Sequence, residues 1–360
     1  MLNHVYAVIL AGGRGERFWP LSTVRQPKQL MPLVGNRPMI AGAVEHIRPL
    51  VPPERIFIIT HADLVKAARR ALPGFPHRNI IGEPVGRDTA AAVTLGAAII
   101  KARDPRAIFC VLTADHIIGD LAVFRRTLMK SFRTVAASNC LLTIGIQPAF
   151  PSTAFGYIEA GSRLSRPGSV EIVNVRRFVE KPSQAKAARY LKTGRFFWNS
   201  GMFIWSLDAF EDALARFQPP LKNLMNRIVP VVNTSRFASV LKAEYARLKK
   251  ISIDYAIMEK ADNIVMAKGT FAWDDVGSWS ALENHFDKDD RQNVAIGRVE
   301  TLDASGNIVV SRDGLVAVLG VDDLVIVRTG HATLVCPKHR AQDVKKMVEL
   351  LKQKKHHDAL

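Results

Sequence analysis

The stretch VYAVILAGGRGERFWPL at residues 5–21 decides the fold of this chain. Residues 6–10 form an apolar run typical of a buried strand, and the run leads directly into Gly12, Gly13 and Gly15. Glycines at this position let backbone N–H groups converge on an anion, because no Cβ atom obstructs the approach. We therefore expect a phosphate to bind here. Taken alone, the same loop could be a tight turn between a strand and a helix.

Outside this loop the pattern alternates strands with helices. Further apolar runs indicate buried strands at residues 56–60, 107–113, 141–146, 172–179 and 202–205. Helical spacing covers residues 39–50 and 89–102, and Asp88 or Thr89 could cap the second of these helices. This alternation predicts an α/β fold, with a Rossmann-like, mixed and mainly parallel sheet and helices on both faces.

The pattern changes near residue 290. Short β segments follow at residues 308–310, 316–319, 324–327 and 333–335, separated by turn pairs such as Asp313-Gly314. A helical pattern over 341–353 closes the chain. We predict two domains: a large α/β domain over residues 1–290, and a small β-rich module with a terminal helix over residues 291–360.

Composition narrows the classes of partner. The chain has 360 residues, of which 48 % are hydrophobic, and a formal net charge of +17, which favours anionic partners. Its basic residues are spread along the chain without interleaved aromatic residues, so we expect phosphorylated small molecules rather than nucleic acid. We see no apolar stretch of about 20 residues and no leader, and expect a cytoplasmic protein without a membrane span. The three cysteines are too far apart in sequence for a zinc site.

Two common phosphate motifs do not fit the loop. The dinucleotide fingerprint needs a third glycine where Phe18 stands and an acidic residue after the next strand, which ends in Thr60-His61. The P-loop needs Lys and then Ser or Thr after its last glycine, but Glu16 follows Gly15. Neither a nicotinamide cofactor nor a P-loop NTPase is expected.

The loop carries its own cations, Arg14 and Arg17, and Pro27-Lys28-Gln29 follows it. The run Leu10-Ala-Gly-Gly-x-Gly-x-Arg-Phe-x-Pro-Leu21, with Lys28 beyond it, resembles the signature of sugar-nucleotide pyrophosphorylases. The details Phe-Trp-Pro-Leu-Ser and Pro-Lys-Gln resemble the mannose-1-phosphate guanylyltransferase branch. The resemblance implies that Arg17 and Lys28 are catalytic, and that the nucleotide is bound by Leu10, Gly12, Gly13, Arg14 and Gly15.

The segment from Glu83-Pro84 to Thr89 resembles the family's base-binding segment. A carboxylate at Glu83 can accept from the N1–H and the amino group of guanine, whereas thymine and uracil offer a single N–H between two carbonyls. The resemblance therefore implies that Glu83, Pro84 and Thr89 bind a guanine nucleotide. The family commonly has Asn where Asp88 stands, and Asp88 and Thr89 could instead be simple helix caps.

Two acidic segments, one around Asp115 and one at residues 273–279, resemble the family's metal-binding segments. Asp115 follows a buried strand, at the edge where open α/β sheets bind ligands. The block from Trp273 to Trp279 resembles the late Trp-x-Asp-x-Gly block, with Asp275 as the ligand and Asp274 as an exposed neighbour. The resemblance implies one Mg²⁺ on Asp115 and Asp275, with Asp115 also touching the nucleotide. The alternative is that Asp274 and Asp275 only form a turn.

Three further segments, at residues 155–159, 178–182 and 198–203, resemble the family's sugar-binding segments and occur in the same order. By resemblance, Gly156 offers backbone contacts to the sugar, Glu180 and Asn199 bind its hydroxyls, and Lys181 meets the sugar phosphate. The module after residue 290 resembles the family's C-terminal appendage, a short left-handed β-helix. Residues 1–290 would then be the nucleotidyltransferase catalytic domain.

The resemblance implies a homodimeric enzyme that transfers GMP from GTP to mannose 1-phosphate, giving GDP-mannose and pyrophosphate. Two alternatives stay open. The chain could use another hexose 1-phosphate or nucleotide, as glucose-1-phosphate thymidylyl- or uridylyltransferases do, or it could be a regulatory subunit that binds a sugar nucleotide without catalysis. Retention of Arg17, Lys28, Asp115 and Asp275 together speaks against the second alternative, because pure binding could dispense with the metal pair.

Overall fold

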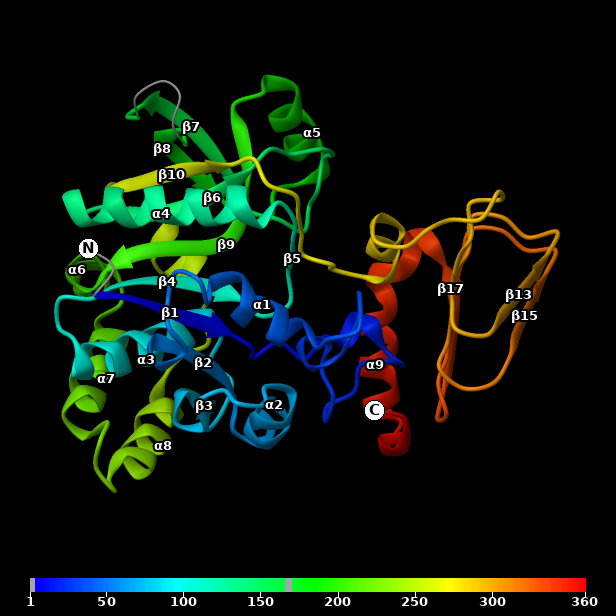
Figure 1. Ribbon diagram of the computed structural model, residues 1–360, viewed down its shortest axis with the longest axis horizontal. Coiled ribbons are helices and arrows are strands. Elements are labelled where there is room, and N and C mark those ends of the chain that lie inside the picture. Colours follow the sequence, from blue (N-terminus) through cyan, green and yellow to red (C-terminus); the bar gives the residue numbers. More distant parts are fainter. Residues whose placement is uncertain (1–3, 166–169) are drawn as a thin grey trace. The chain divides into compact units, whose positions relative to one another are not determined.

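The computed structural model describes residues 4–165 and 170–360, which pack as two compact units (Figure 1). The first unit comprises the chain up to Gly12, Gly42–Ala114 and Ile118–Trp273. The second comprises Gly13–Ala41, Asp115–Ile117 and Asp274–Leu360. Two short strands, β5 (Ile117–Ile118) and β11 (Trp273–Asp274), lie where the chain passes from one unit to the other.

The first unit is built on a nine-stranded mixed sheet in the order β3-β2-β1-β4-β9-β6-β10-β8-β7. Its strands are β1 (Val5–Leu10), β2 (Ile56–His61), β3 (Ile80–Glu83), β4 (Ile108–Thr113), β6 (Leu141–Ile146), β7 (Tyr157–Arg163), β8 (Ile172–Val179), β9 (Phe196–Ser206) and β10 (Ile264–Gly269). The strands β3, β2, β1 and β4 run parallel, and β9 is antiparallel to both β4 and β6. The predicted α/β class with a mixed sheet is confirmed.

The parallel half of this sheet brings two predicted site residues to one edge. β1 is almost wholly apolar and buried, as expected for a parallel strand covered on both faces. The register pairs Leu10 with Thr113 of β4 and with Ile59 of β2, so these strands end together. Glu83 is the last residue of β3 and pairs with His61. Leu10 and Glu83 therefore lie at the carboxyl edge of the sheet, where open α/β sheets bind ligands.

Helices of the first unit cover the sheet (Figure 1). They are α1 (Met39–Ile47), α2 (Val65–Ala71), α3 (Thr89–Arg103), α4 (Leu121–Ala137), α5 (Gln184–Thr193), α6 (Leu207–Phe217), α7 (Pro219–Ile228) and α8 (Phe237–Arg247). The first three residues of α1 are assigned to the second unit, and the rest of it to the first. The small residues of α3 allow a close approach to β1, since a Cβ atom at Gly96 would lie 2.8 Å from a Val8 methyl carbon. The Asp88 carboxylate accepts from the Thr89 N–H and caps this helix, as predicted.

The second unit combines the glycine-rich loop with the C-terminal strands. Its strands are β12 (Val294–Ile296), β13 (Val299–Leu302), β14 (Ile308–Ser311), β15 (Val316–Leu319), β16 (Leu324–Arg328) and β17 (Thr333–Pro337), followed by α9 (Val344–Gln353). The pairs β12–β14, β14–β16 and β13–β15 are parallel, which confirms the predicted β-helix-like class of this module. One core holds Phe18 and Trp19 of the loop with Trp279, Ile308 and Val344, so the C-terminal strands and helix help to fix the loop.

Most predicted elements are present, and the differences have local causes. The final α-helix begins at Val344 because residues 338–343 form a 3-10 helix. The strands β3, β5, β7, β10, β11, β12 and β13 are not among the predicted apolar runs. All of these except β7 and β10 have four residues or fewer, too short for a clear period. The division of the chain at residue 290 stays a prediction. Within the described residues, every helix is too short or too polar to span a bilayer.

Candidate functional site

The glycine-rich loop of the second unit is held in one conformation. Gly15 has a φ of +61°, and a Cβ atom there would lie 2.6 Å from the Lys28 Cβ, so both the backbone and the space require glycine. The Ser22 hydroxyl donates to the Gly15 carbonyl at 2.6 Å. The Gln29 side-chain amide donates to the Gly13 carbonyl at 2.8 Å. Both loop carbonyls are therefore tied back to the segment that follows the loop.

This loop forms one wall of a cavity of about 270 Å³, which we call the cationic pocket. It is lined by Arg14, Gly15, Glu16, Arg17, Phe18, Lys28, Asp115, His116, Asp275, Val276, Gly277 and Lys345. Four of its side chains carry positive charge. The predicted Arg17, Lys28, Asp115 and Asp275 thus line a single pocket, which suits a polyanion bound together with a cation.

Lys28 forms hydrogen bonds to both aspartates that line the pocket. Its side chain is buried, with 4 % of the residue exposed. The Nζ atom donates to the Asp115 carboxylate at 3.2 Å and to the Asp275 backbone carbonyl at 2.5 Å. A buried ammonium is stable only when paired in this way. Burial tends to raise the pKa of Asp115, but the interactions of the carboxylate with its neighbours, the positive charge of Lys28 first among them, together lower it by more. The pKa therefore lies below its usual value, and the carboxylate stays ionised.

Asp274 and Asp275 are adjacent but do different things. Asp274 is not the exposed neighbour that we predicted: its side chain is only 19 % exposed. Its carboxylate accepts from the Val276 N–H at 2.7 Å and from the Asn284 amide at 3.1 Å, and it lies 3.0 Å from His285 Nε2. Asp274 therefore shapes the turn, as an aspartate in a tight loop often does, and its neighbour lines the cationic pocket.

The pKa of Asp275 is raised to about 6, chiefly by burial; Lys28 lowers it, and the nearby charges of Asp274 and Asp115 raise it again. Two carboxylates that repel each other beside one pocket form a fitting site for a divalent cation. Within residues 4–165 and 170–360, no group of three or more His, Cys, Asp or Glu side chains is arranged to hold a metal. A pair of carboxylates suits Mg²⁺, which takes one or two from protein and completes its shell with phosphate oxygens and water.

In the first unit, Glu83 offers a buried carboxylate at the end of β3. A Cβ atom at Gly12 would lie 3.5 Å from Glu83 Oε2, so the carboxylate lies beside Gly12, which belongs to the same unit. Glu83 Oε1 is buried and has no hydrogen-bond partner among the described residues. Burial raises the pKa of Glu83 to about 7, a hydrogen bond with Tyr245 lowers it, and Asp88 raises it. An unsatisfied buried acceptor of this kind is available to a ligand that donates hydrogen bonds.

Pro84 and Thr89, the other two predicted base-binding residues, show no comparable sign of a ligand site. Pro84 is exposed immediately after β3. The Thr89 hydroxyl accepts from the Ile253 N–H at 2.8 Å, so this side chain already has a structural role at the start of α3. Contact of Pro84 or Thr89 with a nucleotide stays a prediction.

The predicted sugar residues gather in one cluster of the first unit, which also contains Asp254 and which we call the Glu180 cluster: Gly156, Glu180, Lys181, Asn199 and Asp254. Lys181 Nζ donates to Glu180 Oε1 at 2.5 Å, and the Asn199 amide donates to Asp254 Oδ1 at 2.9 Å. Glu180 Oε2 is buried without a hydrogen-bond partner in the described chain. A Cβ atom at Gly156 would overlap this oxygen, so a larger residue there would displace the Glu180 carboxylate.

The comparisons with known proteins agree with this geometry. Residues 6–292 match the family model described as nucleotidyl transferase, and residues 297–351 match that of a mannosephosphate isomerase/GMP-like β-helix domain. A protein of Klebsiella pneumoniae named mannose-1-phosphate guanylyltransferase is 38 % identical over 349 residues, covering 96 % of this chain and 74 % of the relative. The chain belongs to the nucleotidyl transferase family and to its mannose-1-phosphate guanylyltransferase branch.

Other members of the branch lead to the same conclusion. A mannose-1-phosphate guanylyltransferase of Escherichia coli strain K12 is 33 % identical over 361 residues, with 99 % of this chain and 75 % of the relative covered. A crystal structure described as mannose-1-phosphate geranyltransferase from Thermus thermophilus superposes with a TM-score of 0.86 at 36 % identity, covering 97 % of this chain and 99 % of that one. The family resemblance inferred from the signature loop is confirmed.

For a nucleotidyl transferase, the predicted residues fall into two groups. The second unit holds the predicted loop, cationic and metal-binding residues, namely Gly13, Arg14, Gly15, Arg17, Lys28, Asp115 and Asp275. The first unit holds the remaining predicted nucleotide residues and the sugar residues, namely Leu10, Gly12, Glu83, Pro84, Thr89, Gly156, Glu180, Lys181 and Asn199. Each group combines residues from distant parts of the sequence. Residues that served only to form local turns would have no reason to be grouped in this way.

Asp254 is a site candidate that sequence reasoning missed. It begins a π-helical turn, Asp254–Met258. Burial raises the pKa of Asp254 to about 7, Glu180 raises it further, and Lys181 and Asn199 lower it. A carboxylate in the apolar run Ile253-Asp-Tyr-Ala-Ile-Met258 was the available signal, since buried acids are rare unless paired.

Proposed function

We propose that this chain transfers GMP from GTP to mannose 1-phosphate, forming GDP-mannose and releasing pyrophosphate. The observation that carries the proposal is the cationic pocket, in which Lys28 bridges Asp115 and Asp275 beside the glycine-rich loop. The names of the relatives at 33–38 % identity support the choice of substrates.

In this reaction, a phosphate oxygen of mannose 1-phosphate attacks the α-phosphorus of GTP, and pyrophosphate leaves as that P–O bond breaks. A phosphate monoester is already ionised at neutral pH, so no general base is required. Catalysis then consists of positioning the reactants and neutralising charge. Arg14, Arg17, Lys28 and the loop amides bind the triphosphate, and Lys181 binds the acceptor phosphate.

Asp115 and Asp275 would hold a Mg²⁺ ion, which supplies positive charge where the transferred phosphate accumulates negative charge. Lys28 keeps the Asp115 carboxylate ionised and oriented for that role. Glu83 accepts from the guanine N1–H and amino group. Gly156, Glu180 and Asn199 bind the mannose. As the family resemblance implies, we further propose a cytoplasmic homodimer whose catalytic domain covers residues 1–290. Light scattering of the purified protein would test the dimer.

A nucleotide panel tests the function. With mannose 1-phosphate and Mg²⁺, pyrophosphate release from GTP is expected to exceed that from UTP, dTTP or ATP by about 100-fold or more in kcat/KM, because a buried carboxylate rejects bases that cannot donate twice. Preference for UTP or dTTP would favour the alternative of a different nucleotide. Tight binding of GDP-mannose without any turnover would favour a regulatory subunit.

Replacing Glu83 by glutamine is expected to weaken GDP-mannose binding by about 10- to 100-fold, because the amide can no longer offer two acceptors to guanine. The raised pKa of about 7 adds a pH dependence. Below this pKa the carboxyl is protonated, so wild-type affinity falls as the pH falls through 7, and the variant loses that dependence. Calorimetry near pH 6 and pH 8 measures both effects, and GDP-mannose is chosen because it lacks a terminal phosphate that titrates near neutrality.

Replacing Gly156 by alanine is expected to raise the KM for mannose 1-phosphate by about tenfold or more, because the new methyl group displaces the Glu180 carboxylate. The KM for GTP should stay within about twofold of the wild-type value. Gly42→Ala is the matched control, since a Cβ atom there meets its nearest neighbour, in His46, only at 3.9 Å. If Gly156→Ala kept the wild-type KM for both mannose 1-phosphate and GTP, the Glu180 cluster would have no part in sugar binding.

A further inference from the structure

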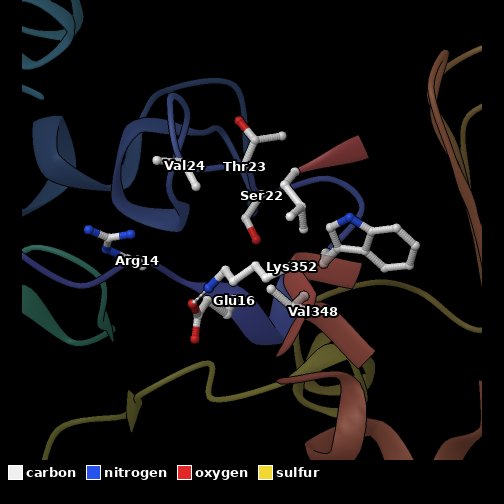
Figure 2. A pocket seen from close by; sticks show the side chains of 9 residues that line it. Arg14, Glu16, Ser22, Thr23, Val24, Val348 and Lys352 are labelled. Carbon is white, nitrogen blue, oxygen red and sulfur yellow. Dashed lines mark hydrogen bonds and ion pairs between the residues drawn. The ribbon is translucent and has the colours of Figure 1, made fainter. Parts of the chain in front are cut away.

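One helix of the C-terminal module packs directly on the glycine-rich loop. Lys352 of α9 lies 2.5 Å from Glu16 Oε1, and Figure 2 shows the two side chains pointing toward each other. Val348, one turn earlier, lines a small cavity together with Glu16, Lys352, Trp19 and Arg14; this cavity is separate from the cationic pocket. The contacts made by α9 therefore reach both the start of the loop and the aromatic residues that follow it.

The segments on either side of α9 are anchored as well. Before the helix, the Gln342 amide donates to the Ser278 hydroxyl at 3.2 Å, and Ser278 directly follows the pocket residue Gly277. After the helix, the Ala359 carbonyl accepts from the Trp19 indole at 2.6 Å. These bonds fix the α9 backbone against both the Gly13–Ala41 segment and the segment that carries Asp275.

The spacing of α9 presents three residues on one side. Lys345, Val348 and Lys352 are separated by three and then four residues, which places them in one stripe of an α-helix. Val348 and Lys352 are the residues that contact the loop, and Lys345 lines the cationic pocket with Arg14, Arg17 and Lys28. The neighbouring Lys346 instead lies 2.7 Å from the Asp343 carboxylate.

The Lys345 ammonium group is only weakly held by another residue. Its ion pair in the described chain is with Glu349, at 4.0 Å, and both side chains are more than half exposed. Such surface pairs are weak, so the ammonium group can turn toward a stronger anion. The acids nearby are occupied: Glu16 pairs with Lys352, and Asp343 lies within 3.0 Å of both Arg340 and Lys346.

We infer that Lys345 is a polyphosphate-binding residue, which contacts the part of the nucleotide that leaves as pyrophosphate. The inference rests on the proposed function. It gives the C-terminal module a direct part in substrate binding, with Lys345 as the ligand-binding side chain and the Glu16–Lys352 pair as its anchor. A flexible, half-exposed lysine suits a group that must be released in each turnover, whereas the buried Lys28 suits the reacting centre.

The test measures binding of inorganic tripolyphosphate in Mg²⁺ by calorimetry to the wild type, Lys345→Ala, Lys345→Arg and the control Lys346→Ala. We expect Lys345→Ala to raise the Kd by about tenfold or more, as loss of a charge-assisted hydrogen bond does, and Lys345→Arg and Lys346→Ala to stay within about threefold. In turnover, Lys345→Ala should raise the KM for GTP and leave that for mannose 1-phosphate unchanged.

Equal tripolyphosphate affinity of Lys345→Ala and Lys346→Ala would overturn the inference, as would the absence of any tripolyphosphate binding by the wild type. The proposed function fails separately, if the wild type makes no GDP-mannose. If the wild type is inactive but Lys345→Ala still loses tripolyphosphate affinity, the polyphosphate site stands and only the assigned reaction is wrong. Thermal unfolding of each variant verifies that the fold is intact.

Discussion

Replacing Lys28 by methionine is expected to lower the kcat of pyrophosphate release by about 100- to 1000-fold. Methionine keeps the buried apolar stem but removes the ammonium that donates to Asp115 and to the Asp275 carbonyl. Three losses then combine. The triphosphate loses a cation, the pKa of Asp115 rises because its main stabilising charge is gone, and the segment that carries Asp275 loses its tie to the pocket.

Lys338 provides a matched control for this change. Its ammonium also joins a carboxylate and a backbone carbonyl of the second unit, Glu283 and Gly306, each at 2.7 Å, but it does not line the cationic pocket. Lys338→Met should lower the melting temperature while kcat stays within about twofold of the wild type. If Lys28→Met had the same profile, a lower melting temperature with near-normal turnover, Lys28 would be a structural residue only.

The strands and helices that sequence predicted well are those with a long, unbroken signal. β1, β4 and β6 are continuous apolar runs that are buried on both faces, so their composition alone marks them. α3 is predicted by its alanine content and its capping Asp88. Strands such as β3 are too short to show a period, and they form because a neighbouring strand supplies the hydrogen bonds.

The candidate site was predictable in its residue types and not in its contacts. Lys28 meets Asp115 and Asp275 across 87 and 247 residues of sequence, and no local pattern records such a pairing. The resemblance to a family supplied these residues as a set. It failed at Asp274, because burial of that carboxylate depends on His285 and Asn284, which reach it only in the folded chain.

The same limit explains why the sequence did not reveal the part that α9 takes. Basic residues at 345–355 are typical of a solvated helix face, and Lys346 does show that behaviour. Lys352 differs because Glu16, 336 residues earlier, meets it. A charge run therefore separates into solvent-facing and site-facing members only through tertiary packing.

Asp275→Asn is expected to lower kcat by about 100-fold or more and to raise the Mg²⁺ concentration needed for half-maximal rate, because the amide replaces one of the two anionic ligands of the ion. Asp274→Asn provides the contrast. The Asp274 carboxylate has a pKa below its usual value, the net result of hydrogen bonds to His285, Val276 and Asn284 that outweigh the effect of burial. Its charge therefore stabilises the fold at neutral pH, and this contribution is lost as the pH falls through the lowered pKa.

Asp274→Asn should consequently destabilise the protein by about 2 kcal/mol at neutral pH, the cost of weakening charge-assisted hydrogen bonds, and leave the Mg²⁺ dependence of the residual activity unchanged. Titrating Mg²⁺ in the pyrophosphate assay and unfolding both variants in urea separates the two effects. If Asp275→Asn instead lost stability and kept the wild-type Mg²⁺ curve, both aspartates would belong to the turn alone, and the metal would have to be held by Asp115 without a second carboxylate from this segment.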